Sequence, residues 1–161
     1  MGGFTLIEVL VTVLILAVGL LGLAGLQTVS IRNNHSAYLR SQAVQLAYDI
    51  ADRVRANSLV NADLTNFDTI TANQNSACFT TAGCNEFQMA ANDLWEWQNQ
   101  VAALLPGGQA VICRDSTPDD GSGSGDGQCD SATTTSLTVK VWWNDDRATA
   151  TSQRFVMSFR P

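Results

Sequence analysis

An unbroken apolar run near the N-terminus dominates the hydrophobic pattern of this chain. Residues 4–26 read FTLIEVLVTVLILAVGLLGLAGL, and a helix of about 20 such residues crosses the roughly 30 Å hydrocarbon layer of a membrane. A cleavable secretory signal would have a basic start and a shorter apolar run. A fully buried soluble helix would need a larger domain around it. The run therefore predicts a membrane-inserted helix.

The helical pattern continues beyond this run but becomes amphipathic. Segment 27–56 contains no proline, and its charged side chains take other faces than its apolar ones. The apolar residues recur at spacings of three, four or multiples of these, as a helix requires: Ile31, Leu39, Ala43, Leu46, Ile50 and Val54. We expect segment 27–56 to be the second half of one long helix that leaves the membrane and packs on a globular head.

Residues 57–161 supply the elements of that head. Residues 57–85 are rich in Asn, Thr, Ala and Ser and indicate a long surface connection. A second helix is predicted from about Phe87 to Leu105, with Leu94, Trp97, Val101 and Leu104 on its apolar face and Pro106-Gly107-Gly108 after it. Three strands are predicted downstream: Gln109 to Arg114, Ser136 to Asn144 and about Thr149 to Arg160.

The last two strands alternate apolar and polar residues, so each offers one face to a core. The apolar residues of the two strands are Leu137, Val139, Val141 and Trp143, then Phe155, Met157 and Phe159. The tract from Asn144 to Arg147 has the composition of a hairpin turn. Trp95 and Trp97 suit core or domain-edge packing better than a binding surface. The expected fold class is α+β, with a long N-terminal helix packed on a small antiparallel sheet.

The charge balance weighs against a nucleic-acid-binding protein. The chain has 15 acidic and 9 basic side chains, for a net charge of −6. Neutralising phosphates requires clustered Lys and Arg. The strands near the C-terminus are mildly basic, which is thin evidence for DNA binding.

Four cysteines lie downstream of the apolar run: Cys78, Cys84, Cys113 and Cys129. An even number suits disulfides in an oxidising compartment. Structural zinc sites use closer Cys pairs, and the single histidine, His35, is far upstream. Three connectivities are possible, and pairing Cys78 with Cys84 and Cys113 with Cys129 closes the shortest loops.

The loop DSTPDDGSGSGDGQCD, residues 115–130, raises two ligand-binding alternatives. A phosphate cradle should carry a cation and open a helix, whereas this loop is acidic and leads into a strand. Its aspartates lack the spacing of an EF-hand calcium loop. A flexible loop closed by Cys113 and Cys129 is the favoured interpretation, and no metal or cofactor is expected.

Catalysis is not expected either. The chain has no G-x-S-x-G nucleophile motif, and His35 has no second polar cluster near it in sequence. Paired carboxylates such as Asp119 and Asp120 lie in a loop without the apolar setting that would raise a pKa for acid–base chemistry.

Glu8 is the one charge inside the apolar run. An ionised carboxylate costs about 2.5–3.5 kcal/mol at mid-bilayer and less near the interface. Glu8 could stay among the headgroups at the positive end of the helix dipole. Alternatively, it pairs with a cation supplied by another subunit.

Gly3-Phe4-Thr5-Leu6-Ile7-Glu8 followed by an apolar run resembles the processing and assembly signature of type IV pilins and pseudopilins. The resemblance implies that a prepilin peptidase cuts after Gly3 and that the new N-terminal Phe4 is N-methylated. It also implies that Glu8 is the assembly glutamate. Cleavage creates an amine at Phe4, and the amine of a neighbouring subunit is a suitable partner for the Glu8 carboxylate.

Met1-Gly2-Gly3 departs from the family pattern, because the leader normally carries Lys or Arg before the glycine. We expect residues 1–3 to be what remains of a leader. Arg32 and Arg40 favour a cytoplasmic head by the positive-inside rule. The cysteines override this, because disulfides form outside the cytoplasm. The expected location is the bacterial inner membrane with a periplasmic head, then the pilus at the cell surface.

Further segments resemble PilV-type minor pilins: GLLGLAGLQ from Gly19, YDIADRVRAN from Tyr48, and the LWEWQ, LPGG and VWWND tracts. This resemblance implies a minor pilin that joins the filament through its N-terminal helix and supports assembly or priming, at or near the tip. Its partners would be other major and minor pilins, with no small-molecule substrate. A type II secretion pseudopilin and a tip module that binds surfaces or DNA are the alternatives.

Overall fold

The computed structural model describes residues 3–57, 70–130, 135–145 and 152–161. The chain divides into an N-terminal unit, Met1–Tyr38, and a head, Leu39–Pro161. Its elements are α1 (Leu6–Ala56), the short 3-10 helix η2 (Ser76–Phe79), α3 (Glu86–Leu104), β1 (Gln109–Cys113), β2 (Leu137–Asn144) and β3 (Ser152–Phe159). The α+β fold class is confirmed: a long apolar N-terminal helix and a three-stranded antiparallel sheet.

The N-terminal unit exposes its apolar side chains throughout. No residue of α1 before Leu39 is buried, and Leu14 and Leu21 are 65% and 74% exposed. An 18-residue stretch of α1 has a mean hydropathy of 2.8, and by length and composition it could cross a membrane. Ile31, expected to continue the core stripe, is 69% exposed because it lies in this unit.

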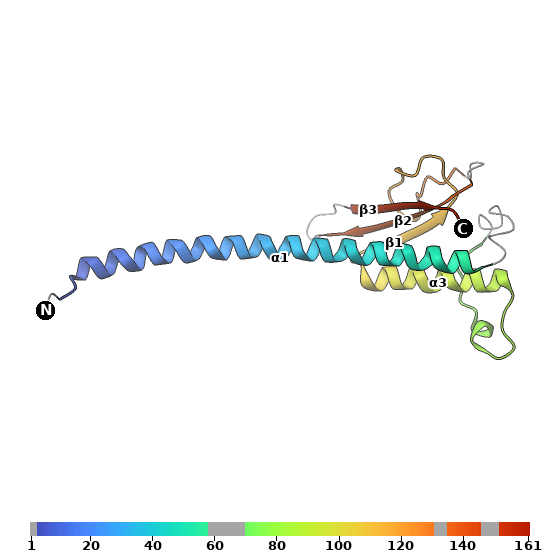
Figure 1. The fold of residues 1–161 in the computed structure, drawn as a ribbon, viewed down its shortest axis with the longest axis horizontal. Helices are drawn as coiled ribbons and strands as arrows, with labels where there is room; N and C mark the ends of the chain where they lie inside the picture. Colours follow the sequence, from blue (N-terminus) through green and yellow to red (C-terminus); the bar gives the residue numbers. More distant parts are fainter. Residues whose placement is uncertain (1–2, 58–69, 131–134, 146–151) are drawn as a thin grey trace. The chain divides into compact units, whose positions relative to one another are not determined.

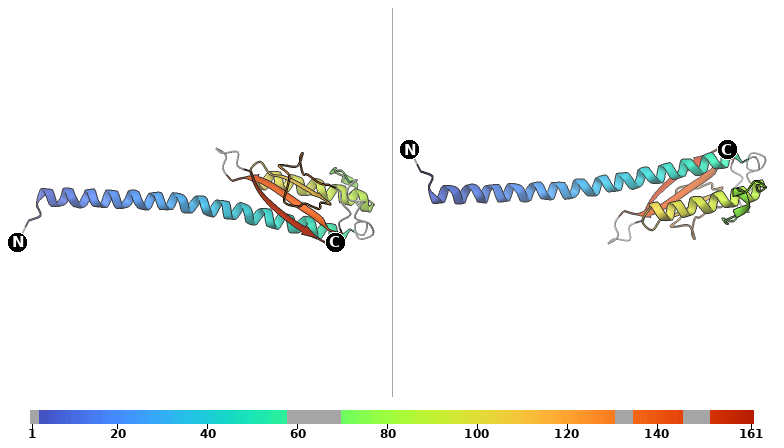
Figure 2. Two further views of the ribbon diagram at one scale, coloured as in Figure 1. Left: turned by 90° about the horizontal axis from the view of Figure 1, so that it is seen from above. Right: turned by 90° about the horizontal axis from the view of Figure 1, so that it is seen from below.

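The head is built around one apolar core. The C-terminal part of α1 contributes one stripe and α3 runs antiparallel beside it (Figures 1 and 2). Trp97 of α3 is fully buried, and its indole N–H donates to the Leu46 carbonyl oxygen of α1 at 2.9 Å. The expectation that Trp97 packs in the core is confirmed, whereas Trp95 is half-buried.

The helix predicted near Phe87 begins at a capping box. The Asn85 side chain accepts from the Gln88 N–H at 2.9 Å, and the Gln88 side chain accepts from the Asn85 N–H at 3.1 Å. These bonds satisfy amides that the first turn leaves without partners. At the other end Leu104 is 49% exposed and Leu105, just past the helix, is 1% exposed. Leu105 therefore fills the core position that the sequence assigned to Leu104.

The sheet has the order β1-β2-β3, with β2 in the centre and every pair antiparallel. Val139 lies opposite Ile112 of β1 and Met157 of β3. The core-facing residues of β2 are those expected: Leu137, Val139, Val141 and Trp143. Part of the expected hairpin turn from Asn144 to Arg147, and residues 149–151 of the third strand, lie outside the described residues.

Candidate functional site

The N-terminal end of α1 carries the three residues that the sequence assigned to processing and assembly. Gly3 precedes the helix with open space around its α-carbon, and Phe4 is 85% exposed. The Thr5 carbonyl oxygen accepts from the Glu8 and Val9 amides at 3.1 and 3.3 Å and starts the helix. The backbone around the expected cleavage position therefore lies outside the helix and is accessible.

Glu8 lies in the first turn of α1 and is exposed. Negative charge is favoured there, because the free amides of the first turn give the helix end a partial positive charge. Among the residues that the structure describes, Glu8 has no salt-bridge partner.

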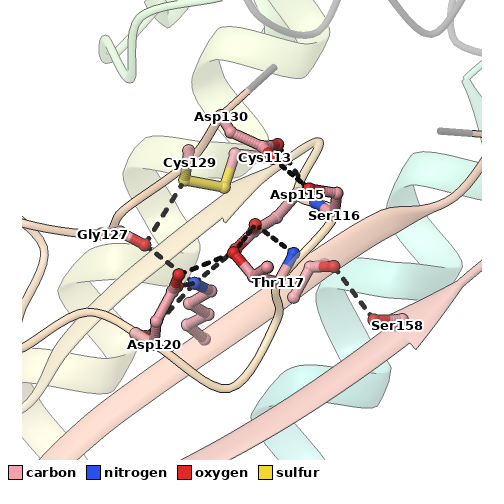
Figure 3. The surroundings of a disulfide bond; sticks show 11 residues. Cys113, Asp115, Ser116, Thr117, Asp120, Gly127, Cys129, Asp130 and Ser158 are labelled. Atoms are coloured by element: carbon pink, nitrogen blue, oxygen red, sulfur yellow. Dashed lines mark hydrogen bonds and ion pairs between the residues drawn. A yellow bond between two sulfur atoms is a disulfide. The ribbon is translucent and has the colours of Figure 1, made fainter. Parts of the chain in front are cut away.

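The four cysteines form two disulfides in the head, Cys78–Cys84 and Cys113–Cys129. This is the connectivity with the shortest loops. The first bond closes the turn that contains η2, just before α3, and the second joins the end of β1 to a residue beyond a long loop. Figure 3 shows the second bond beside that loop.

An ion cluster joins α1 to α3. The Arg53 guanidinium pairs with Asp49 of its own helix and with Asp93 and Glu96 of α3, at 3.0, 3.1 and 3.0 Å. Burial raises the pKa of Asp93, and the hydrogen bond and charge of Arg53 oppose that rise without cancelling it. Burial lowers the pKa of Arg53, but the hydrogen bonds to Glu96 and Asp93 outweigh it, so the pKa is raised overall. The cluster fastens the two helices.

A second charged cluster, which sequence analysis missed, lies on the sheet face away from the core. Lys140 of β2 is fully buried. Its ammonium donates to the Asp120 carboxylate at 2.6 Å and to the carbonyl oxygens of Asp120 and Gly127 at 3.2 and 2.8 Å, and it pairs with the buried Asp115 carboxylate. Figure 3 shows Asp115, Asp120 and Gly127 gathered over the sheet.

These contacts set the protonation states of the Lys140 cluster. Burial lowers the pKa of Lys140, but the hydrogen bonds and charges of Asp115 and Asp120 outweigh it and leave that pKa raised. Hydrogen bonds from Lys140 and Thr117 lower the pKa of Asp120. Both groups are therefore charged over a wide range around neutral pH.

The described residues contain no group of three or more His, Cys, Asp or Glu side chains arranged to hold a metal ion. An open surface pocket of about 350 Å³ lies by the end of α1, lined among others by Arg53, Asn57, Met89 and Asp93. Among the described residues, its lining includes no serine, histidine or free thiol.

Two family models match the chain in succession. Residues 1–24 match the prokaryotic N-terminal methylation motif, and residues 25–95 match the Tt1218-like family, described as type IV pilin Tt1218. No curated protein and no solved structure matches. The first 95 residues thus carry a methylation motif followed by a type IV pilin region, which confirms the resemblance at the level of the pilin family.

The pilin match confirms the prediction that the chain is not an enzyme, because pilins are structural proteins. The methylation motif implies processing by a prepilin peptidase and assembly with pilins. Together with the exposed apolar helix, it is consistent with residence in the inner membrane and the pilus.

Proposed function

We propose that the chain is a minor pilin of the PilV type that assembles through its N-terminal helix into a type IV pilus. In this proposal residues 1–3 are removed as leader, Phe4 becomes the methylated N-terminus, and the head reaches the periplasm and then the cell surface. The chain supports assembly or priming at or near the filament tip. The observation that carries the proposal is an exposed Glu8 at the start of an exposed apolar helix, with no salt-bridge partner among the described residues.

Physical reasons support assembly through this helix. The apolar side chains of α1 before Leu39 are exposed in the part of the chain that the structure describes, and water is a poor environment for them. Lipid covers them before assembly, and packed helices of other subunits cover them afterwards. Glu8 favours the second state, because an amine at residue 4 of a neighbour neutralises a carboxylate that lipid cannot.

Replacing Glu8 tests this pairing directly. We expect Glu8→Val to reduce incorporation into sheared pili by about tenfold or more, because loss of one charge-assisted pair costs at least about 1.4 kcal/mol. Glu8→Asp keeps the charge and serves as the matched control, with a smaller loss. Quantitative immunoblotting of pili and membranes provides the measurement. Equal incorporation of Glu8→Val and wild type would refute the proposed role of Glu8.

The sheared pili also allow a test of the proposed cleavage after Gly3 and methylation of Phe4. Mass spectrometry of the protein from sheared pili should find an N-terminal methylated Phe4 and two disulfides. An unmethylated chain that still begins before Gly3 would contradict the assignment of Gly3 and Phe4.

A type II secretion pseudopilin is the main alternative, because it shares the N-terminal motif. Pilus genes beside the coding sequence would favour the minor pilin, and secretion genes would favour the pseudopilin. The structure weakens the alternative in which the head binds DNA. Lys140 is buried and paired with Asp120, and Arg154 is paired with Asp119, so two cations of the basic segment already have aspartate partners.

A further inference from the structure

The acidic loop between β1 and β2 crosses the sheet on the face away from the core. We call residues 114–130 the strap. The Gln109 side chain of β1 accepts from the Ser124 N–H at 2.9 Å, and Arg154 of β3 donates to the Gly121 carbonyl oxygen at 3.0 Å. Gln109 and Arg154 both lie opposite Trp142 of β2. The strap therefore spans the row in which Trp142 is central, and Trp142 is only 3% exposed.

The path of the strap is closely packed. Gly121 has a φ of +85°, a left-handed conformation that favours glycine. A Cβ at Gly123 would lie 2.7 Å from the Gln109 side-chain oxygen. These glycines let the backbone approach the sheet, so they serve the packing of the strap.

The Lys140 ammonium lies at a point where oxygen atoms of the acidic loop converge, as they do around a metal ion in other acidic loops. Two carboxylates and two backbone carbonyl oxygens converge on its ammonium. Carboxylate and carbonyl oxygens are also the ligands of a hard cation such as Ca²⁺. Lys140 is the only lysine in the chain.

We propose that the Lys140 ammonium is the structural cation around which the strap folds, in place of a metal ion. In this assignment the charge, rather than the Cys113–Cys129 disulfide, keeps the strap over Trp142. The disulfide fixes only the ends of the loop and acts mainly on the unfolded chain. Removing the ammonium leaves the Asp115 carboxylate buried without its counter-charge, which destabilises the folded strap itself.

Hydrogen exchange on the full chain in detergent distinguishes the contribution of the Lys140 charge from that of the Cys113–Cys129 disulfide. In Lys140→Met, whose side chain is of similar length but neutral, strap amides should exchange at least about tenfold faster than in wild type. In Cys113→Ser/Cys129→Ser they should stay within about threefold of wild type. Arg40→Met, which removes an exposed cation elsewhere, is the control for net charge.

A double variant distinguishes charge from shape. Lys140→Met with Asp115→Asn removes both buried charges, so strap protection should recover toward wild type. A purely steric role for the lysine stem predicts little loss of protection in Lys140→Met and therefore nothing for the second substitution to recover. Absence of recovery, or strap protection that depends on the disulfide more than on Lys140, would overturn the proposal.

The unique lysine offers a test that does not depend on the folding of Lys140→Met. Wild type and Cys113→Ser/Cys129→Ser are treated with a water-soluble amine-acylating reagent, and modification of Lys140 is followed by peptide mass spectrometry. We expect the two proteins to react at rates within about threefold of each other, far slower than after denaturation. Rapid acylation of Lys140 in the disulfide variant would overturn the proposal.

Discussion

At the scale of single residues, Arg53 and Asp93 show how a shared guanidinium controls protonation. Arg53 faces three carboxylates, and two of them, Asp93 and Glu96, come from α3. Asp93 has a raised pKa because burial penalises its charge more than Arg53 relieves it. A group with a raised pKa in the folded state binds its proton more tightly there than when unfolded. Its contribution to stability is therefore lost as the pH rises through the folded pKa.

Arg53→Met should raise the pKa of Asp93 further, because the variant removes the two effects that lower it. The free energy of unfolding of the head should then fall more steeply than in wild type as the pH rises from below 3.8, the ordinary value for Asp, through the raised pKa. Chemical denaturation across that range measures the slope. Arg55→Met is the matched control, because its partner Asp52 has a side chain that is 73% exposed. Parallel slopes for Arg53→Met and wild type would contradict this account.

At the scale of elements, the capping box of α3 links a short sequence signal to the stability of the helix. Asn85→Ala should lower the free energy of unfolding by about 1 kcal/mol, because it removes the acceptor for the Gln88 amide. Gln88→Ala removes the reciprocal bond but should cost less, because Gln88 lies inside the helix, where alanine has the highest helix propensity and offsets part of the loss. Urea denaturation of both variants compares them. A larger loss for Gln88→Ala than for Asn85→Ala would invert the expected order.

Periodicity predicted the elements well because each has one dominant apolar face. The 3.6-residue stripe of α1 and the alternation in β2 reflect burial against the same core, and the structure follows both. The other face of β2 was not predicted. Lys140 looks like an ordinary solvent-facing residue in an alternating strand, and its burial depends on a loop whose path no local pattern encodes. The convergence of Asp115, Asp120 and Lys140 arises only from long-range packing.

The N-terminal residues illustrate the opposite case. Gly3, Phe4 and Glu8 were assigned from a short motif, and their proposed chemistry requires other molecules. For these residues the structure shows only that Phe4 is exposed and that Glu8 is unpaired among the described residues. Their roles therefore depend on the motif and on the tests of assembly, rather than on contacts within the chain.

At the scale of the whole molecule, the head buries its apolar side chains in its own core, whereas the N-terminal unit exposes them. Every buried apolar residue of the described core lies between Leu39 and Phe159. The apolar side chains of the N-terminal unit are exposed and suit lipid or other helices. The head also contains both disulfides, which constrain its unfolded state. Its stability therefore does not require the N-terminal unit.

A fragment of residues 32–161 should fold as a soluble monomer with both disulfides intact, because it keeps the whole core and removes the apolar run. Its circular dichroism should show a cooperative thermal transition, and light scattering should give the monomer mass without detergent. A fragment that begins at Leu14 retains much of the exposed apolar helix and should require detergent for the same behaviour. A non-cooperative transition in the shorter fragment would mean that residues before Arg32 help to build the head, contrary to the burial pattern.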